Sequence, residues 1–362
     1  MKFRNFLLIA ILSWFMSACA PVGTDVSPTE DLAQNTTPTG ETPMMKQPLI
    51  TTMYTADPSA HVFEGKLYIY PSHDLDHDNP GTNDGDQFDM EDYHVFSMES
   101  VQSPLVDHGE VLHVRDVPWA TKQMWAPDAA FKDGAYYLYF PARDKDHIFR
   151  IGVATSKSPA GPFTAEPEYI QGSFSIDPCV FVDDDGQVYM YFGGLWGGQL
   201  EKWQTGEFDP NGTEPVATQA ALGPRVAKLS EDMLGFDGPA QEISITDENG
   251  QPITAGDRSR RFFEASWVHK YNGVYYLSYS TGDTHYIAYA TSESPTGPFV
   301  FRGYILFPVI GWTTHHSIVE FDGKWYLFYH DSSLSGGVTH KRSMKFTELF
   351  YNPDGTIKPI DP

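Results

Sequence analysis

Cysteine is nearly absent from this sequence, whose 362 residues contain only Cys19 and Cys179. Cys19 lies in the N-terminal segment discussed below, so a mature chain in which its sulfur is modified has no intrachain disulfide. Cys179 begins the apolar stretch Cys179-Val180-Phe181-Val182, and no neighbouring residue suggests a base paired with it. We therefore expect Cys179 to be a small buried hydrophobic side chain and not a nucleophile.

Basic residues are also scarce, because 24 Lys and Arg stand against 48 Asp and Glu, a formal net charge of −24. Such a charge repels nucleic acids and anionic lipid headgroups, so we expect no nucleic-acid partner and a neutral or cationic ligand instead. Aromatic residues make up 14% of the chain. Aromatic rings stack on sugars, but strands favour them too, so composition favours a sugar-binding protein only slightly over an ordinary all-β protein.

Long hydrophobic runs are missing except near the N-terminus, where Phe6–Phe15 follows a basic start. The run is too short to span a membrane and predicts a signal peptide over residues 1–18. The next residues resemble a bacterial lipoprotein box, which implies cleavage before Cys19, lipidation of its sulfur and membrane contact through that lipid alone. An ordinary cleavage site near Ala20 is the alternative. Because Ala20 is not Asp, the chain lacks the usual inner-membrane retention signal, and we expect a secreted lipoprotein of the bacterial outer membrane.

Residues 19–47 are rich in Thr, Pro, Ser, Glu and Gly, which is typical of a flexible linker. The folded body is therefore expected over residues 48–362. It has no long amphipathic helical segment, and one strand-like pattern occurs in it five times. Each copy is a polar turn with a glycine followed by an aromatic-rich strand, centred on Gly65, Gly134, Gly186, Gly273 and Gly323.

Glu-Gly, Asp-Gly and Asn-Gly before alternating apolar residues predict hairpins, and each interval between the copies can hold a four-stranded sheet with its loops. We therefore predict an all-β fold, a five-bladed β-propeller. A β-sandwich is the alternative, but it would not explain five equivalent hairpins.

One ionisable residue stands six to nine residues before the glycine of each hairpin: Asp57, Asp128, Asp177, Glu264 and His315. The innermost strands of a propeller start at one end of its axis, so these side chains should share one depression. Clustered acids are unfavourable unless a metal, a shared proton or a function stabilises them. An acid that only accepts backbone hydrogen bonds in a turn would explain any one of the five, but not five at matching positions.

The motifs around these residues resemble those of glycoside hydrolase family 43, in order along the body: Asp57-Pro58-Ser59, Trp125-Ala126-Pro127, Ile176-Asp177-Pro178, Phe263-Glu264-Ala265 and His315-His316-Ser317. The resemblance implies a five-bladed propeller that hydrolyses xylose- and arabinose-containing polymers and oligosaccharides with inversion. The stretches 89–94 and 193–198 look most like its β-xylosidase and α-L-arabinofuranosidase members.

The resemblance implies that Asp57 is the general base, Glu264 the general acid, and Asp177 a third carboxylate that keeps the acid protonated and oriented. Inverting hydrolysis needs the base and the acid about 6.5–9.5 Å apart, so that a water fits between base and sugar. An ionised Asp177 and nearby apolar residues would raise the pKa of Glu264, while Asp57 would stay ionised in a more solvated place.

The resemblance also implies a metal, because His315 matches the axial histidine that family members use beside a central ion, usually calcium with several waters. We therefore expect Ca²⁺ bound through His315 and water. The alternative is a histidine that hydrogen-bonds Glu264 or Asp177 and orients it without any metal. His316 could substitute for His315, since adjacent residues of a strand point to opposite faces.

Three further residues are expected at the substrate. Trp125 is predicted to form a wall of the sugar pocket, with a core position as the alternative. Asp128 is predicted to contact the sugar, and Arg342 to hydrogen-bond sugar hydroxyls, with a surface role as its alternative. The acidic stretch from Asp74 to Asp86 is interpreted as a loop at the pocket rim, and less readily as a second cation site.

The favoured function is an exo-acting glycosidase that releases terminal β-D-xylose and/or α-L-arabinofuranose from plant cell-wall oligosaccharides, because the long intervals between hairpins hold loops able to build a pocket. The alternatives are an endo-arabinanase or another furanosidase of the family, or a non-catalytic sugar-binding lipoprotein, which should lack one catalytic carboxylate. The sequence leaves open the choice between the two sugars, the linkage and the oligomeric state.

Overall fold

The computed structural model describes residues 46–82 and 84–362, which belong to one compact unit, Glu41–Pro362. The predicted signal peptide, the predicted lipidation site Cys19 and most of the predicted linker lie outside the described residues. Within the described part of the chain, no helix is long and apolar enough to cross a lipid bilayer.

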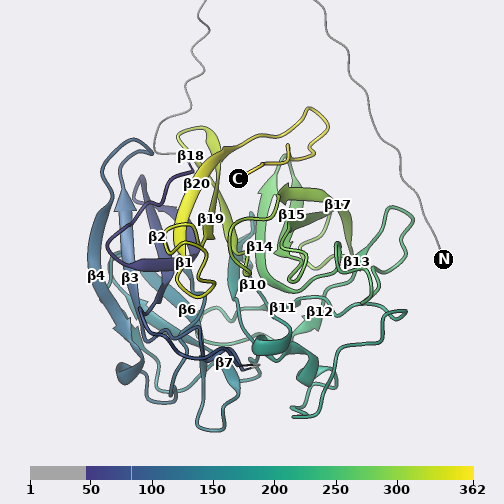
Figure 1. Ribbon diagram of the computed structural model, residues 1–362, viewed down its shortest axis with the longest axis horizontal. Helices are drawn as coiled ribbons and strands as arrows, with labels where there is room; N and C mark the ends of the chain where they lie inside the picture. The colour runs from purple at the N-terminus through teal and green to yellow at the C-terminus, as the bar shows by residue number, and fades with distance from the viewer. Residues whose placement is uncertain (1–45, 83) are drawn as a thin grey trace, which may run out of the picture. The chain divides into compact units, whose positions relative to one another are not determined.

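Five sheets form the blades of a β-propeller, as predicted (Figure 1). The first contains β1 (Tyr54–Phe63), β2 (Lys66–Asp74), β3 (Asp92–Met98) and β4 (Val106–His113). The second contains β5 (Asp128–Lys132), β6 (Ala135–Arg143), β7 (Phe149–Ser156) and β8 (Thr164–Ala165). The third contains β9 (Cys179–Val182), β10 (Val188–Phe192), β11 (Arg225–Lys228) and β12 (Gln241–Glu242).

The fourth sheet contains β14 (Glu264–Tyr271), β15 (Val274–Ser280), β16 (Ile287–Ser292) and β17 (Phe299–Leu306), with β13 (Ile245–Thr246) added parallel to β17. The fifth contains β18 (His316–Phe321), β19 (Lys324–Asp331) and β20 (Ser343–Leu349). In the described residues, helix is limited to three short 3₁₀ turns, η1 (Val114–Asp116), η2 (Trp196–Gly198) and η3 (Leu200–Trp203).

Tight turns at the predicted glycines join the first two strands of most blades. In four blades both central residues of the turn have positive φ, as a two-residue type I′ hairpin requires: Glu64-Gly65, Asp133-Gly134, Asn272-Gly273 and Asp322-Gly323. The third blade has a longer turn, closed by a 2.9 Å hydrogen bond from the Asp183 N–H to the Gln187 carbonyl. The hairpin signals thus locate the innermost two strands of every blade.

The five innermost strands pack in a closed ring, because β1 contacts β18 and β5, β9 contacts β5 and β14, and β14 contacts β18. The first residues of the body complete the fifth blade. The backbone N–H groups of Lys46, Leu49 and Thr55 donate to carbonyls on or beside β20 at 2.9–3.0 Å. Two chain segments far apart in sequence therefore close the ring.

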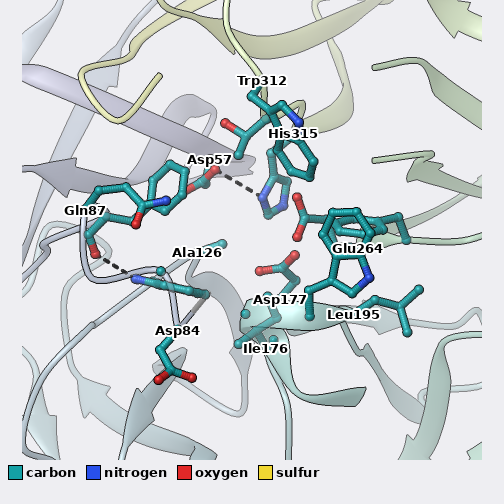
Figure 2. Close-up of a pocket in the computed structure, with 18 of the residues that line it drawn as sticks. Asp57, Asp84, Gln87, Ala126, Ile176, Asp177, Leu195, Glu264, Trp312 and His315 are labelled. Atoms are coloured by element: carbon teal, nitrogen blue, oxygen red, sulfur yellow. Dashed lines mark hydrogen bonds and ion pairs between the residues drawn. The ribbon is translucent and has the colours of Figure 1, made fainter. Parts of the chain in front are cut away.

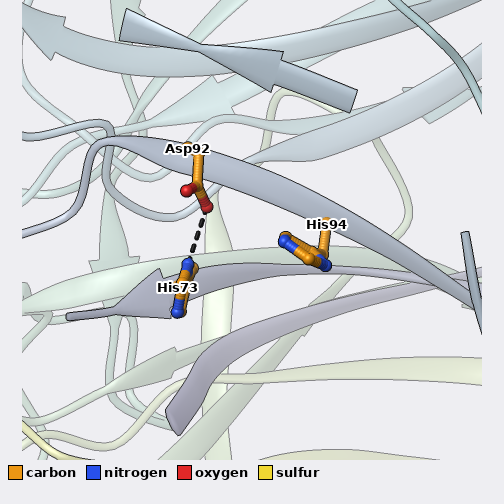
Figure 3. Close-up of side chains that lie close together, drawn as sticks. All are labelled: His73, Asp92 and His94. Carbon is orange, nitrogen blue, oxygen red and sulfur yellow. Dashed lines mark hydrogen bonds and ion pairs between the residues drawn. The ribbon is translucent and has the colours of Figure 1, made fainter. Parts of the chain in front are cut away.

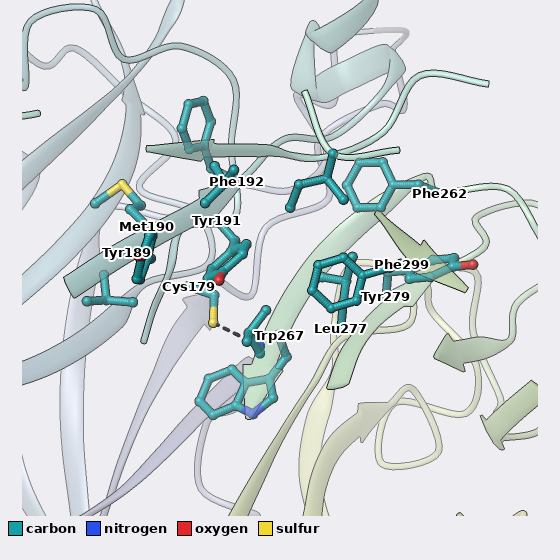
Figure 4. Close-up of a cluster of buried hydrophobic side chains, with 14 of the residues drawn as sticks. Cys179, Tyr189, Met190, Tyr191, Phe192, Phe262, Trp267, Leu277, Tyr279 and Phe299 are labelled. Atoms are coloured by element: carbon teal, nitrogen blue, oxygen red, sulfur yellow. Dashed lines mark hydrogen bonds between the residues drawn. The ribbon is translucent and has the colours of Figure 1, made fainter. Parts of the chain in front are cut away.

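Side chains of the innermost strands link neighbouring blades. Cys179 is 1% exposed, as predicted, and its Sγ accepts a hydrogen bond from the Val268 N–H at 3.3 Å (Figure 4). Trp267 Nε1 donates to the Ile318 carbonyl at 3.0 Å. Figure 4 shows Cys179 beside Trp267 and Tyr191 in the apolar core shared by blades three and four.

Candidate active site

A pocket of about 670 Å³ opens at the end of the ring where the innermost strands begin. Four of the five ionisable residues expected there line it: Asp57, Asp177, Glu264 and His315. Figure 2 shows these four side chains pointing into one space from different sides. Two long connections contribute to the lining: the β2–β3 connection with Asp84, Gly85 and Phe88 among others, and the β10–β11 connection with residues 195–198, Glu201 and Lys202.

Asp57 occupies a bulge of β1, where the pairing with β2 shifts register and φ is 49°. A bulge re-aims a strand side chain, which places this carboxylate at the pocket. Its Oδ1 accepts a hydrogen bond from Arg342 Nη1 at 2.9 Å, and its Oδ2 accepts one from Ser72 Oγ at 2.5 Å. The carboxylate is therefore fixed on both oxygens.

The pKa of Asp57 lies well below its usual range, although burial by itself would raise it. The guanidinium of Arg342 is the largest lowering influence, followed by the contact with His315. We expected solvation to keep Asp57 ionised, and this was wrong, because only 5% of the residue is exposed. A buried cation keeps Asp57 ionised.

Arg342 is held by Asp74 at the end of β2. Its Nε and Nη2 donate to the two carboxylate oxygens of Asp74 at 2.8 and 2.7 Å, and its guanidinium carbon lies 5.2 Å from the ring centre of Phe88. The surface alternative for Arg342 is excluded, since it is 3% exposed and lines the pocket. Its main partners are carboxylates, and a contact with sugar hydroxyls stays a prediction.

A neutral histidine fixes the backbone at the bulge. The Asp57 N–H donates to His330 Nδ1 at 3.0 Å, and His330 Nε2 lies 3.1 Å from the carbonyl of Thr313. An Nδ1 that accepts a hydrogen bond leaves the ring proton on Nε2, where it meets that carbonyl. Burial lowers the pKa of His330, in keeping with a neutral ring. We did not predict this role of His330.

Glu264 begins β14, and the next residue, Ala265, has a φ of 62°. The pairing of β14 with β15 shifts register just after Glu264, so this acid also lies at a bulge. Burial raises the pKa of Glu264 well above its ordinary value, and the charges of Asp177 and Asp57 raise it further. Glu264 therefore carries a proton under conditions in which Asp57 is ionised.

Asp177 lies two residues before β9 with a φ of 57°. Its Oδ2 accepts a hydrogen bond from the Ala265 N–H at 2.8 Å, which ties it to the residue beside Glu264. Burial raises the pKa of Asp177 to about 6, with a further contribution from Asp57. Two neighbouring acids with raised pKa values share protons, and an ionised Asp177 favours protonation of Glu264.

A buried ionised carboxylate and a protonated carboxylic acid in one pocket are the two groups that glycoside hydrolysis needs. The family model of glycosyl hydrolases family 43 matches residues 45–357. The chain belongs to this family. The resemblance seen in five ordered motifs is thereby confirmed, and the protein is a glycosidase.

Known relatives align with this family 43 chain over nearly all of its folded body. A xylosidase/arabinosidase 43A from Humicola insolens is 63% identical over 319 residues, covering 86% of this chain and 98% of that protein. A xylosidase/arabinosidase from Bacteroides ovatus is 54% identical, covering 87% and 98%. A beta-xylosidase from Xylanibacter ruminicola is 49% identical, covering 85% and 97%.

Solved structures agree with the fold of this family 43 enzyme. A family 43 beta-xylosidase/alpha-arabinofuranosidase from a compost microbial metagenome, a calcium-free form in complex with xylotriose, has a TM-score of 0.86 and 65% identity and covers 88% of this chain and 97% of that one. A family 43 enzyme from Xanthomonas citri complexed with xylotriose has a TM-score of 0.84 and 57% identity, covering 87% and 93%.

His315 immediately precedes β18 and lines the pocket of the family 43 site, with Nδ1 3.3 Å from Asp57 Oδ1 (Figure 2). Burial lowers its pKa, but the charges of Asp177 and Asp57 outweigh burial and raise the pKa overall. His316 points elsewhere. It is fully buried, contacts Ser278 Oγ and does not line the pocket, so it is no substitute for His315.

The acids and histidines that the structure describes around His315 do not by themselves form a complete calcium site. Calcium prefers six to eight oxygen ligands. The groups of three acids or histidines within 4.8 Å, among the described residues, do not include His315. A calcium ion beside His315 therefore needs further oxygen ligands, which water in the pocket can supply.

Asp128 requires a correction. It begins β5, but it is 1% exposed and does not line the pocket. Its Oδ1 is bonded to Ser59 Oγ and His61 Nε2, and its Oδ2 accepts from the Val180 N–H. Asp128 thus joins the innermost strands of blades one, two and three, and the predicted sugar contact was wrong because protein groups occupy both oxygens. The alternative of an acid that only accepts backbone hydrogen bonds in a turn does not describe Asp128 either, because it lies in β5 and two of its three partners are side chains.

Trp125 lines the pocket, and its indole Nε1 donates to the carbonyl of Phe88 at 2.9 Å. Trp125 also packs on Phe149 with the ring centres 4.7 Å apart, so it has contacts on both the pocket and the core side. The loop at the pocket rim passes so close to Trp125 that it needs glycine at position 85. A Cβ on Gly85 would lie 2.7 Å from the Trp125 ring.

Three further aromatic residues line the family 43 pocket, and we did not predict this role for Trp196, Phe263 and Trp312. Trp196 lies 4.9 Å from Phe263 and 5.9 Å from Trp312, between ring centres. The run of glycines at 193–198 was a usable signal. A Cβ on Gly194 or Gly198 would lie within 2.7 Å of Ile176, so only glycines let this loop approach the segment that carries Asp177.

The acidic stretch from Asp74 to Asp86 is partly a rim, as predicted, because Thr82, Asp84 and Gly85 line the pocket. Lysines neutralise much of it. Lys341 Nζ lies 2.6 Å from Asp76 and 2.9 Å from Asp78, and Lys122 Nζ lies 2.7 Å from Asp86. These ion pairs give the stretch its counter-charges without a second cation.

Proposed function

We propose that this protein is an exo-acting, inverting glycosidase that releases terminal β-D-xylose and/or α-L-arabinofuranose from oligosaccharides. The observation that carries the proposal is the contrast between two carboxyls of one pocket: Asp57 is held ionised by Arg342, and Glu264 is held protonated by burial beside Asp177. This division assigns the base and the acid without reference to the sugar.

Asp57 is the general base in this mechanism. Its Oδ1 and Oδ2 are positioned by Arg342 and Ser72, and it takes a proton from a water that attacks the anomeric carbon. Attack from the face opposite the leaving group inverts the configuration. His330 fixes the backbone of Asp57, so the base keeps its place while its charge changes.

Glu264 is the general acid, and it protonates the glycosidic oxygen as the bond to the anomeric carbon breaks. Asp177 is a positioning residue in this step. Its hydrogen bond to the Ala265 N–H orients the start of β14, and its charge raises the proton affinity of Glu264. A water from bulk then reprotonates Glu264, and Asp57 loses its proton to solvent, which restores the enzyme.

The long connections beside the site support exo action. Residues of the β2–β3 connection and residues within 195–202 of the β10–β11 connection line the pocket together with the carboxylates, whereas an endo-acting arabinanase needs an open groove. The relatives named xylosidase/arabinosidase support xylose and arabinofuranose as the sugars, and neighbours of known structure hold xylose and xylotriose. A non-catalytic sugar-binding protein is disfavoured, because all three carboxylates line the pocket.

The direct experiment compares hydrolysis of xylobiose and xylotriose with hydrolysis of linear arabinan, and identifies the product anomer by NMR. We expect xylose released from one end with initial α configuration from β-linked substrate. Faster release of internal fragments from arabinan would overturn the exo assignment, and an initial β anomer would overturn inversion.

The role of each carboxylate can be separated by the leaving group. Glu264→Gln should lose about 10²–10⁴-fold of kcat on xylobiose and much less on a nitrophenyl β-xyloside, whose leaving group needs little protonation. Asp57→Asn should lose activity on both substrates to the same degree, because the attacking water needs the base in each case. Equal losses for Glu264→Gln on the two substrates would show that Glu264 is not the acid.

We further propose that calcium, when bound, lies beside His315 with water as its other ligands, and that it supplies positive charge near Asp57 and Asp177. Support comes from the place of His315 at the pocket and from the calcium-free description of one solved relative. Removing divalent ions with a chelator should lower kcat, and added Ca²⁺ should restore it. A chelated enzyme with unchanged kcat would remove calcium from this proposal.

For the cell, we propose attachment to the outer membrane through a lipid on Cys19, supported by the signal-like residues 1–18 and the box before Cys19. Metabolic labelling with a radioactive fatty acid should mark the wild-type chain and not Cys19→Ser. Label on both chains would place the lipid elsewhere.

A further inference from the structure

A group of histidines and carboxylates lies on the first blade, outside the active-site pocket. His73 comes from β2, and Asp92 and His94 come from β3 two residues apart, so both β3 side chains project from one face of the sheet. One ligand atom from each residue lies within 4.8 Å of the others. Figure 3 shows His73 opposite Asp92, joined to it by a hydrogen bond, and His94 beside this pair.

We propose that His73, Asp92 and His94 form a binding site for a divalent transition-metal ion of the zinc class. Two imidazoles and one carboxylate are a donor set that suits zinc and disfavours calcium or magnesium. Three protein ligands leave a fourth position for water. The site is independent of the proposed hydrolysis and of His315.

The carboxylate partner of His94 is a second observation that points to a metal. Asp107 Oδ1 lies 3.1 Å from His94 Nδ1, an arrangement in which Nδ1 donates and Nε2 is the nitrogen available to a metal ion. Metal-bound histidines are commonly held in this way, because a carboxylate on one ring nitrogen orients the other toward the ion. Asp107 therefore prepares His94 as a ligand.

The remaining two ligands are already close together and reachable from solvent. His73 Nδ1 and Asp92 Oδ1 lie 2.7 Å apart as a hydrogen-bonded pair, so an ion that binds both residues displaces the proton between them. The side chains of His73, Asp92 and His94 are 17%, 12% and 16% exposed. An ion can thus enter without opening the blade, while the partial burial restricts the side chains and lowers the entropy lost on binding.

A neighbouring group, Asp92 with Glu110 and His113, competes for the same carboxylate but is less suited. One ring nitrogen of His113 is already engaged, because Nδ1 accepts a hydrogen bond from the Arg115 N–H at 3.1 Å. Glu110 is already paired with the guanidinium of Arg115. We therefore assign the ion to the group that contains His73 and His94.

The test uses the full chain without a histidine tag, freed of metal and titrated with Zn²⁺ by equilibrium dialysis in a His315→Ala background that removes the axial histidine. We expect one zinc per chain. His73→Gln and His94→Gln should each weaken binding at least tenfold, and Asp107→Asn should weaken it about 10–100-fold. His108→Gln, a change on the same blade outside the group, is the matched control and should leave the affinity unchanged.

Folding is checked separately by near-ultraviolet circular dichroism. Each variant in the His315→Ala background must keep the spectrum of its parent. Zinc affinity that is unchanged in His94→Gln overturns the proposal. Loss of zinc in His113→Gln with retention in His73→Gln also overturns it, since the ion would then occupy the neighbouring group. Absence of stoichiometric zinc in the parent overturns it outright.

Discussion

The two sides of the active-site pocket hold the same chemical group in opposite states. On one side, Asp57 meets the guanidinium of Arg342 and the hydroxyl of Ser72, and its pKa is lowered. On the other side, Glu264 meets an acid, Asp177, and its pKa is raised. Burial raises the pKa on both sides, so the difference between base and acid comes from the charged neighbours, the cation Arg342 beside Asp57 and the acid Asp177 beside Glu264, and not from solvent access.

The largest expected effect comes from removing that cation. Arg342→Met would leave Asp57 and Asp74 buried without a counter-charge, which should destabilise the protein by about 3–5 kcal/mol and abolish hydrolysis. Urea unfolding measures the loss. Arg302→Met, an arginine whose Nε donates to the hydroxyl of Thr291, is the matched control and should change stability by less than about 0.5 kcal/mol. Equal unfolding midpoints for the two variants would contradict this role of Arg342.

Substitutions at the two carboxyls should next change the free energy of unfolding in opposite directions. Asp57 has a lowered folded pKa, so it contributes stability above its unfolded pKa of about 3.9 that is lost as pH falls through the folded value. Glu264 has a raised folded pKa and opposes folding at neutral pH. Asp57→Asn should therefore lower Tm at pH 7, and Glu264→Gln should raise stability by roughly 1 kcal/mol, although both lose activity.

Scanning calorimetry at pH 7 and at pH 3 tests this contrast. The deficit of Asp57→Asn should shrink at pH 3, where this carboxyl is already mostly protonated in the unfolded wild-type chain. Parallel shifts of both variants in one direction would show that the two environments do not differ as described.

A smaller effect should follow from removing the negative charge beside the acid. Asp177→Asn removes the repulsion that helps keep Glu264 protonated, so the alkaline limb of the kcat/KM profile should move down by roughly one pH unit. Asp184→Asn, which removes an exposed charge, should leave the limb in place. An upward movement in Asp177→Asn would mean that Asp177 does not repel the ionised Glu264.

Much of this architecture could be predicted from local patterns. The glycines of the hairpins have positive φ in the structure, and a two-residue turn needs this conformation regardless of what surrounds it. Because the hairpins mark the inner strands, residues at their starts could be expected at the axis. The prediction held for Asp57, Asp177, Glu264 and His315, and it failed for Asp128, whose place at a strand start is the same but whose carboxylate is taken by Ser59, His61 and Val180.

The sequence by itself determined the repeats, the strand starts and the kinds of side chain placed there, because turns and alternation depend on neighbours along the chain. Only the tertiary structure decided which carboxyl is ionised. Arg342 lies 285 residues from Asp57 and directly precedes β20 of the fifth blade. Asp74 and Phe88, which hold Arg342 in place, belong to the first blade. Electrostatic energy depends on distance in space and on burial, and neither can be read along the chain.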